Sequence, residues 1–184
     1  MRKIILLLAI IGFLTIFSSP VSAEIIAGES ASFQKVDPQT QTETLKYLRA
    51  KKVIKKVLEK HNSPMIDATD DFIETCKQYQ LDCYLLPAIA GLESSFGKFI
   101  YPNSYNAFGW ARGYMMFDDW GEGIYTVGKG LRENYIDKGA TDLQSIGKIY
   151  CELPTWAGKV TKILAEFYIE DKNLLYLEQN EVKL

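Results

Sequence analysis

Residues 85–98 read Leu-Leu-Pro-Ala-Ile-Ala-Gly-Leu-Glu-Ser-Ser-Phe-Gly-Lys. The first part of this stretch is apolar and predicts a helix, and Gly97 is suited to the left-handed turn that ends one. One acidic residue, Glu93, closes the apolar run and shares a helical face with Ile89 and Ala90. A carboxyl held against apolar surface is poorly solvated, so we expect its pKa to be raised. Such a group can act as a general acid, which makes Glu93 the first candidate catalytic residue.

Helical spacing of apolar residues recurs on both sides of this stretch, and we find neither an alternating pattern suited to a large sheet nor an internal repeat. The sequence therefore predicts an all-α, single-domain fold, with at most a small hairpin in the loop 100–117. That loop is rich in aromatic residues, so we expect it to cover or line a cleft. The further predicted helices span residues 43–61, 64–80, 118–137, 141–150 and 156–167.

The amino terminus has the pattern of a secretory signal. Arg2 and Lys3 precede an apolar run over residues 4–17, and Val21-Ser22-Ala23 supplies a cleavage site. The run is short for a membrane span of about 20 residues, although an uncleaved anchor is the alternative. We therefore expect a secreted, periplasmic or wall-associated protein. Its predicted parts are a signal peptide (1–23), a flexible linker (24–42), an amino-terminal helix (43–62), the main domain (63–170) and a tail (171–184).

Charge and cysteine content restrict the classes of partner. The chain carries 21 Lys and Arg against 23 Asp and Glu, a net charge of −2. It therefore lacks the excess of positive charge with which proteins bind nucleic acid or an anionic membrane. The three cysteines, in an oxidising compartment, predict one disulfide and one free thiol. Cys76 and Cys83 flank a turn between two predicted helices and form a plausible pair. Cys83 with Cys151 is the rival pairing, and three buried thiols are a further alternative.

Several chemistries are excluded by composition. His61 is the one histidine of the chain, which removes histidine-based zinc motifs and disfavours a Ser-His-Asp triad. No glycine-rich segment has the spacing of a phosphate-binding loop. We therefore expect neither a metal nor a cofactor. Carboxylate chemistry beside aromatic surface remains, and it suits carbohydrate cleavage, in which a protonated acid meets the leaving oxygen.

Two motifs then carry a family resemblance. Residues 86–98 and the segment Asn106-Ala107-Phe108-Gly109-Trp110 together resemble the signature of bacterial peptidoglycan-cleaving glucosaminidases of the lysozyme-like superfamily. The soluble lytic transglycosylases are more distant relatives. Residues 146–150 followed by residues 156–160 resemble a later cleft motif, although residues 150–152 depart from the transglycosylase pattern. The resemblance covers about residues 63–168.

The resemblance implies a lysozyme-like fold and cleavage of β-1,4 bonds between N-acetylglucosamine and N-acetylmuramic acid in peptidoglycan by a monomer. Glu93 is the implied catalytic acid, and Tyr150 the tyrosine that approaches it. The implied substrate-binding residues are Ser94, Asn106, Phe108, Trp110 and Trp156. Each has a structural alternative: Ser94 as a local hydrogen bonder, and the aromatic residues as packing.

Two questions stay open at the level of sequence. Asp118, Asp119 and Glu122 precede a predicted helix, where acidic residues favour its amino-terminal end, so capping competes with service as a second carboxylate. Without a second carboxylate, the intermediate is either hydrolysed with help from the substrate's N-acetyl group or lost as an anhydro-sugar by transglycosylation. The rivals from other classes are a non-catalytic glycan-binding wall protein and an interaction module built on the helix at 43–61.

Overall fold

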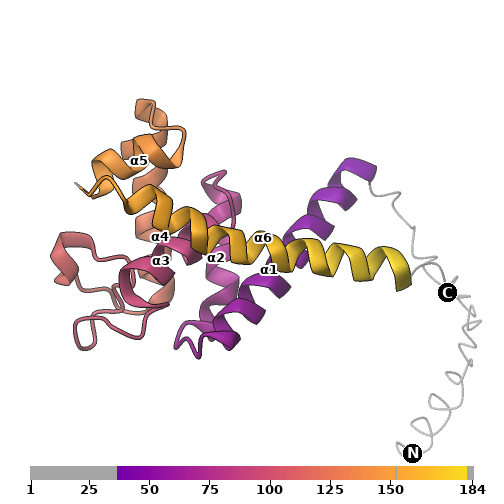
Figure 1. The fold of residues 1–184 in the computed structure, drawn as a ribbon, viewed down its shortest axis with the longest axis horizontal. Coiled ribbons are helices and arrows are strands. Elements are labelled where there is room, and N and C mark those ends of the chain that lie inside the picture. The colour runs from indigo at the N-terminus through magenta and orange to yellow at the C-terminus, as the bar shows by residue number, and fades with distance from the viewer. Residues whose placement is uncertain (1–36, 152, 182–184) are drawn as a thin grey trace, which may run out of the picture. The chain divides into compact units, whose positions relative to one another are not determined.

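The structure is a computed structural model that describes residues 37–151 and 153–181. Its regular elements are all helical over this range, which confirms the all-α prediction (Figure 1). Within the described residues the loop 100–117 forms no strand, and one backbone hydrogen bond of 2.9 Å, from Phe117 to Ser104, closes it instead of a hairpin ladder. The main helices are α1 (Pro38–Lys60), α2 (Thr69–Gln78), α3 (Leu85–Ser94), α4 (Trp120–Gly130), α5 (Leu143–Tyr150) and α6 (Trp156–Glu181).

Helix α3 is the central element of the domain. Leu86, Ala88, Ile89 and Ala90 are each at most 1% exposed, because α3 packs against both α6 and α4. A helix that is apolar on all sides is stable only when neighbours cover every face, and this surrounding explains the uninterrupted apolar run. The burial of α3 places its carboxyl-terminal end, with Glu93, at the edge of the core.

Helix α1 belongs to the same packed unit as the rest. Val53, Ile54 and Val57 are fully buried, and α1 packs along α6 and α2 (Figure 1). The helix begins at Pro38, a favourable first position, so residues 38–42 are helical and the predicted linker ends five residues too late. The boundary predicted between residues 62 and 63 therefore does not separate two structural units.

The long pair α1 and α6 is also joined by charge. Arg49 contacts Asp171 at 2.6 Å, and Lys60 contacts Glu166 at 2.7 Å. Both pairs remain partly accessible to solvent, where an ion pair contributes about 0–1 kcal/mol, so the apolar contacts dominate. Helix α6 continues to Glu181, and the prediction of a tail from residue 171 is wrong in its secondary structure. The additional turns are largely exposed and lie beyond the core.

The predicted helix over 118–137 is a composite. Helix α4 is followed by a π-helical turn (Leu131–Tyr135) and a short 3₁₀ turn (Ile136–Lys138) that ends at Gly139 with φ 98°. Gly130 lies at the junction, where an added Cβ would be 2.2 Å from Cη2 of Trp110. The wider turn and this glycine bring the end of α4 against the aromatic loop.

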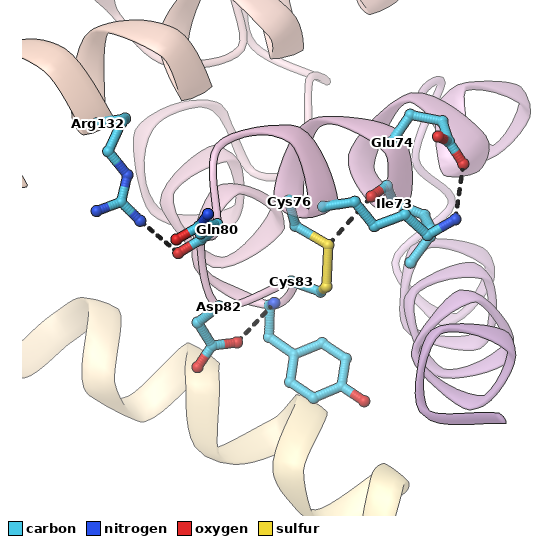
Figure 2. The surroundings of a disulfide bond; sticks show 9 residues. Ile73, Glu74, Cys76, Gln80, Asp82, Cys83 and Arg132 are labelled. Carbon is cyan, nitrogen blue, oxygen red and sulfur yellow. Dashed lines mark hydrogen bonds and ion pairs between the residues drawn. A yellow bond between two sulfur atoms is a disulfide. The ribbon is translucent and has the colours of Figure 1, made fainter. Parts of the chain in front are cut away.

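A disulfide joins Cys76 at the end of α2 to Cys83 before α3 (Figure 2). It closes the short turn between the two helices, which restricts the unfolded chain and holds the start of α3. Beside it, the Asp82 carboxylate accepts a hydrogen bond of 2.9 Å from the backbone N–H of Tyr84. Cys151 is the free thiol, and it is partly buried. The pairing of Cys76 with Cys83 is thus the one formed, and the rival with Cys151 is not.

The predicted signal peptide and most of the predicted linker lie outside the described residues. In the helices between residues 37 and 181 that the structure describes, no segment combines the length and the apolar character needed to cross a bilayer.

Candidate active site

The site begins with the way α3 ends. Its cap residue Ser95 has φ 50°, and Phe96 and Gly97 continue in the left-handed region with φ 61° and 82°. Ser63 donates a hydrogen bond of 2.8 Å from Oγ to the carbonyl oxygen of Phe96. Non-glycine residues adopt this conformation only where surrounding contacts impose it. The chain therefore turns away at Ser95 and leaves Glu93 at a rigid helix end.

Ser94 stabilises the same turn from inside. Its hydroxyl lies 3.0 Å from the carbonyl oxygen of Ala90 and 2.8 Å from that of Ala107, and it accepts the backbone N–H of Gly97 at 2.8 Å. The residue is 4% exposed. Predicted as substrate-binding, Ser94 instead has its hydrogen-bonding capacity used within the protein. In the structure Ser94 has the alternative role given above, that of a local hydrogen bonder at the end of α3.

The Glu93 carboxyl lies between an indole and a backbone turn. Its Oε1 accepts a hydrogen bond of 2.7 Å from Nε1 of Trp156, and its Oε2 lies 3.4 Å from the position of an added Cβ on Gly109. The residue keeps an open surface toward solvent, yet loss of water around the carboxyl raises the pKa of Glu93 above its ordinary value. This effect outweighs the Trp156 hydrogen bond and the Lys159 charge, which both lower the pKa.

Trp156 acts as a support for this carboxyl. It is 3% exposed, stacks on Tyr150 with ring centroids 5.0 Å apart, and lies against Gly147, where an added Cβ would be 2.9 Å from its Cε3. The indole is therefore buried among protein groups, and the role of Trp156 in binding substrate stays a prediction. The side chain positions Glu93 by packing α5 against the start of α6.

Tyr150 is close to Glu93 but directed elsewhere. Its hydroxyl donates a hydrogen bond of 2.8 Å to the carbonyl oxygen of Phe108. Burial raises the pKa of Tyr150 well above its ordinary value, and the Glu93 charge raises it further, so the phenol stays neutral. A neutral phenol can donate a hydrogen bond but cannot serve as a base near neutral pH. The catalytic role of Tyr150 stays a prediction, and its observed contact is a positioning one.

The Asn-x-Phe-Gly segment is mostly internal. Phe108 is 1% exposed, so its ring packs in the core, and its role in binding substrate stays a prediction. Its backbone carbonyl oxygen accepts the hydrogen bond from Tyr150. Asn106 is 2% exposed, and its amide donates to the carbonyl oxygens of Trp110 at 2.8 Å and Met115 at 3.2 Å. Its Oδ1 accepts the backbone N–H of Trp110 at 3.2 Å. Asn106 therefore organises the loop that borders the site.

Two pockets meet at the turn 109–113. The first, which we name the acid lobe, has a volume of about 450 Å³ and is lined by Glu93, Ser94, Phe99, Ile100, Tyr101, Asn106, Gly109, Arg112, Gly113 and Tyr114. The second, the tyrosine lobe, has a volume of about 460 Å³ and is lined by Gly109, Trp110, Ala111, Arg112, Asn134, Tyr135 and Tyr150. Of the three aromatic residues predicted to bind substrate (Phe108, Trp110 and Trp156), Trp110 is the one that lines either lobe. Gly109 and Arg112 line both lobes, and we call the two lobes together the groove.

Among the residues that line the two lobes, Glu93, in the acid lobe, is the one with a carboxyl group. The alternative candidates are used at the start of α4: Asp119 accepts the backbone N–H of Glu122 at 2.8 Å, and Glu122 accepts that of Asp118 at 2.6 Å. Capping is therefore the observed role of this acidic cluster. Glycosidases that use two carboxyl groups hold them about 5–9.5 Å apart across the bond. The groove offers no such pair.

Seven residues of the acid lobe were not among the predicted site residues, and four of these have aromatic or charged side chains. Phe99, Tyr101 and Tyr114 are 77%, 53% and 68% exposed, and the last two form an edge-to-face pair with centroids 5.5 Å apart. Arg112, from the turn 109–113, lines the same lobe. The aromatic richness of the loop signalled a cleft, but nothing in its spacing distinguished the outward rings from the inward ones.

Other candidate sites are weaker. Across the part of the chain that the structure describes, no cluster of three His, Cys, Asp or Glu side chains is arranged to hold a metal ion. A larger pocket of about 560 Å³ lies away from Glu93, with Leu85, Ile146 and Leu164 among its lining residues. Its size does not outweigh the raised-pKa carboxyl and exposed rings of the acid lobe. No protein-family model and no curated protein sequence matches this chain.

Proposed function

We propose that this protein is a secreted peptidoglycan-cleaving enzyme that cuts β-1,4 glycosidic bonds between N-acetylglucosamine and N-acetylmuramic acid, with Glu93 as the general acid. The observation that carries the proposal is the Glu93 carboxyl itself. Its pKa is raised by loss of water, Trp156 holds it in place, and it opens on a pocket bordered by exposed aromatic rings. Aromatic faces suit the C–H faces of sugars. The disulfide and the amino-terminal signal pattern support export.

In the first step, protonated Glu93 donates its proton to the glycosidic oxygen as the bond from that oxygen to the anomeric carbon breaks. The leaving sugar departs with a free hydroxyl, and Glu93 becomes a carboxylate. The Trp156 N–H is placed to stabilise that carboxylate, because its hydrogen bond favours the charged form. The raised pKa thus keeps Glu93 protonated before the step, and the Trp156 hydrogen bond stabilises its carboxylate after the step.

In the second step, the positive charge at the anomeric carbon needs a partner, and the groove supplies no second carboxylate. The carbonyl oxygen of the substrate's own 2-acetamido group can bond to that carbon and form an oxazolinium ion. Water then adds to the anomeric carbon as the bond from that carbon to the acetamido oxygen breaks, and water gives a proton to Glu93, which completes hydrolysis. In the alternative, the substrate's 6-hydroxyl attacks the same carbon, the same bond to the acetamido oxygen breaks, and the hydroxyl proton passes to Glu93. This route yields an anhydro-sugar and makes the protein a lytic transglycosylase.

The test is clearing of purified cell wall in a gel by wild-type protein and by Glu93→Gln. We expect wild type to clear the wall and Glu93→Gln to lose clearing by at least 100-fold, with an unchanged circular dichroism spectrum. Mass spectrometry of the products separates hydrolysis from transglycosylation, because the anhydro product is lighter by one water. If oxidised wild-type protein clears no wall of several different chemistries, the proposal that the protein is an enzyme is refuted.

The exposed rings favour one second candidate, a non-catalytic glycan-binding wall protein. In that case Glu93→Gln leaves wall binding and biological function unchanged, while loss of the rings at Tyr101 and Tyr114 abolishes both. Sedimentation of each variant with insoluble wall measures the difference.

A further inference from the structure

The groove contains one cation besides its one acid. Of the residues that line the two lobes, Glu93 and Arg112 are the two whose side chains carry charge near neutral pH. Glu93 carries no charge while it is the protonated acid, so the groove then has a net positive charge. The whole chain, by contrast, has a net charge of −2. A local cation in an acidic protein creates a field for a negatively charged group at that place.

Arg112 lies at the junction of the two lobes. Together with Gly109 it lines both of them. Gly109 also lies directly against the Glu93 carboxyl. A glycan chain that places its scissile bond at Glu93 and runs through both lobes therefore passes Arg112 close to the bond that is cut.

The guanidinium is not used inside the protein. In the described part of the chain no hydrogen bond or ion pair joins the Arg112 side chain to another residue, and the residue is exposed. Arg132 offers a contrast, since its side chain donates to the backbone carbonyl oxygens of Tyr79 and Gln80. The N–H donors of Arg112 are thus available to a ligand, whereas those of Arg132 form hydrogen bonds within the protein.

The backbone of the turn holds Arg112 in an uncommon conformation. Ala111 and Arg112 both have positive φ, at 50° and 58°. Such a conformation costs a non-glycine residue about 1–2 kcal/mol. Asn106 binds the ends of the turn through the backbone of Trp110 and Met115, and Gly113 donates to Gly109 at 3.0 Å. Arg112 therefore lies on a turn whose conformation is held by these hydrogen bonds.

We propose that Arg112 recognises a carboxylate on the glycan and so makes the site prefer acidic glycan strands over neutral polymers of N-acetylglucosamine. The inference rests on the proposed function and adds a determinant of substrate class to it. Guanidinium groups bind carboxylates through paired, charge-assisted hydrogen bonds, which an ammonium cannot reproduce in the same geometry. In peptidoglycan the carboxylate has two sources: the lactyl ether of a muramic acid freed of its peptide, or the peptide stem.

The test compares wild type, Arg112→Gln and Arg112→Lys on three soluble substrates. These are glycan strands with intact stems, strands from which an amidase has removed the stems, and chitohexaose as the neutral glycan. We expect Arg112→Gln to lower kcat/KM about 10-fold to 100-fold on at least one acidic substrate and less than 2-fold on chitohexaose. A loss confined to the amidase-treated strands identifies the lactyl carboxylate, and a loss confined to intact strands identifies the stem.

Arg112→Lys should recover only part of the loss, and 0.5 M salt should shrink the difference between wild type and Arg112→Gln. Lys129→Gln is the matched control, because it removes an exposed positive charge that borders neither lobe. Equal losses on all three substrates, or no loss on either acidic one, overturn the inference.

Binding separates this inference from the proposed function. In the Glu93→Gln background we measure Kd for the same three glycans with and without Arg112→Gln. If wild type cleaves nothing, the proposed function fails. The inference then stands or falls on whether Arg112→Gln weakens binding to an acidic glycan about 10-fold while leaving chitohexaose unaffected.

Discussion

Gly147→Ala tests the proposal that packing between α5 and α6 positions the acid. A Cβ on Gly147 would lie 2.9 Å from Cε3 of Trp156, the indole that donates a hydrogen bond to Glu93. Overpacking of this kind costs about 1–3 kcal/mol, while replacing a helical glycine with alanine returns about 1 kcal/mol. The net change in the free energy of unfolding is therefore a loss of about 0–2 kcal/mol. The indole also stacks on Tyr150, so we expect relief of the clash to move its N–H away from Glu93.

Gly158→Ala is the matched control. Gly158 also lies in a helix, and an added Cβ there meets nothing within 4 Å. We expect this variant to be more stable by about 0.5–1 kcal/mol and fully active. The difference between the two alanine variants cancels the backbone contribution and leaves the overpacking, about 1–3 kcal/mol, or roughly 2–12 °C in Tm.

The assay is urea unfolding followed by circular dichroism, with wall clearing measured on the same preparations. Gly147→Ala should be less stable than Gly158→Ala and at least 10-fold less active under conditions in which both are folded. Equal stability and full activity of the two variants would contradict the positioning of Glu93 through Trp156.

Three further predictions concern the acid and the disulfide. Trp156→Phe removes a hydrogen bond that favours ionised Glu93, so the pKa of Glu93 should rise further and the alkaline limb of the pH–activity profile should move to higher pH; an unmoved limb contradicts this. The raised pKa of Glu93 means that the folded state opposes its ionisation, so Glu93→Gln should be more stable than wild type above the folded pKa and equal to it below the unfolded pKa. Urea unfolding at pH 7.5 and at pH 3.5 checks this sign. Cys83→Ser should cost about 2–3 kcal/mol of unfolding free energy in oxidised protein, whereas Cys151→Ser should change it by less than about 0.5 kcal/mol.

Local sequence patterns account for most of the helices but not for their ends. The apolar spacing in residues 43–61 predicted α1, yet the helix starts at Pro38, where polar residues carry no periodic signal. In the same way α6 continues through a charged segment after residue 171. Exposed helical turns need no apolar face, so periodicity cannot detect them. The π-helical turn at Leu131–Tyr135 was not predicted either, because the apolar spacing favoured one continuous helix over 118–137.

The amino-acid sequence by itself determined the all-α class, the central apolar helix and the acid at its end, because each depends on local hydrophobic pattern and on a single residue type. Tertiary structure alone decided which aromatic side chains support the acid and which face solvent. Trp156 and Phe108 are buried while Phe99, Tyr101 and Tyr114 are exposed. It also decided that Arg112, from a turn with no regular pattern, shares a groove with Glu93. Those outcomes depend on contacts between residues far apart in the chain, and no local periodicity contains them.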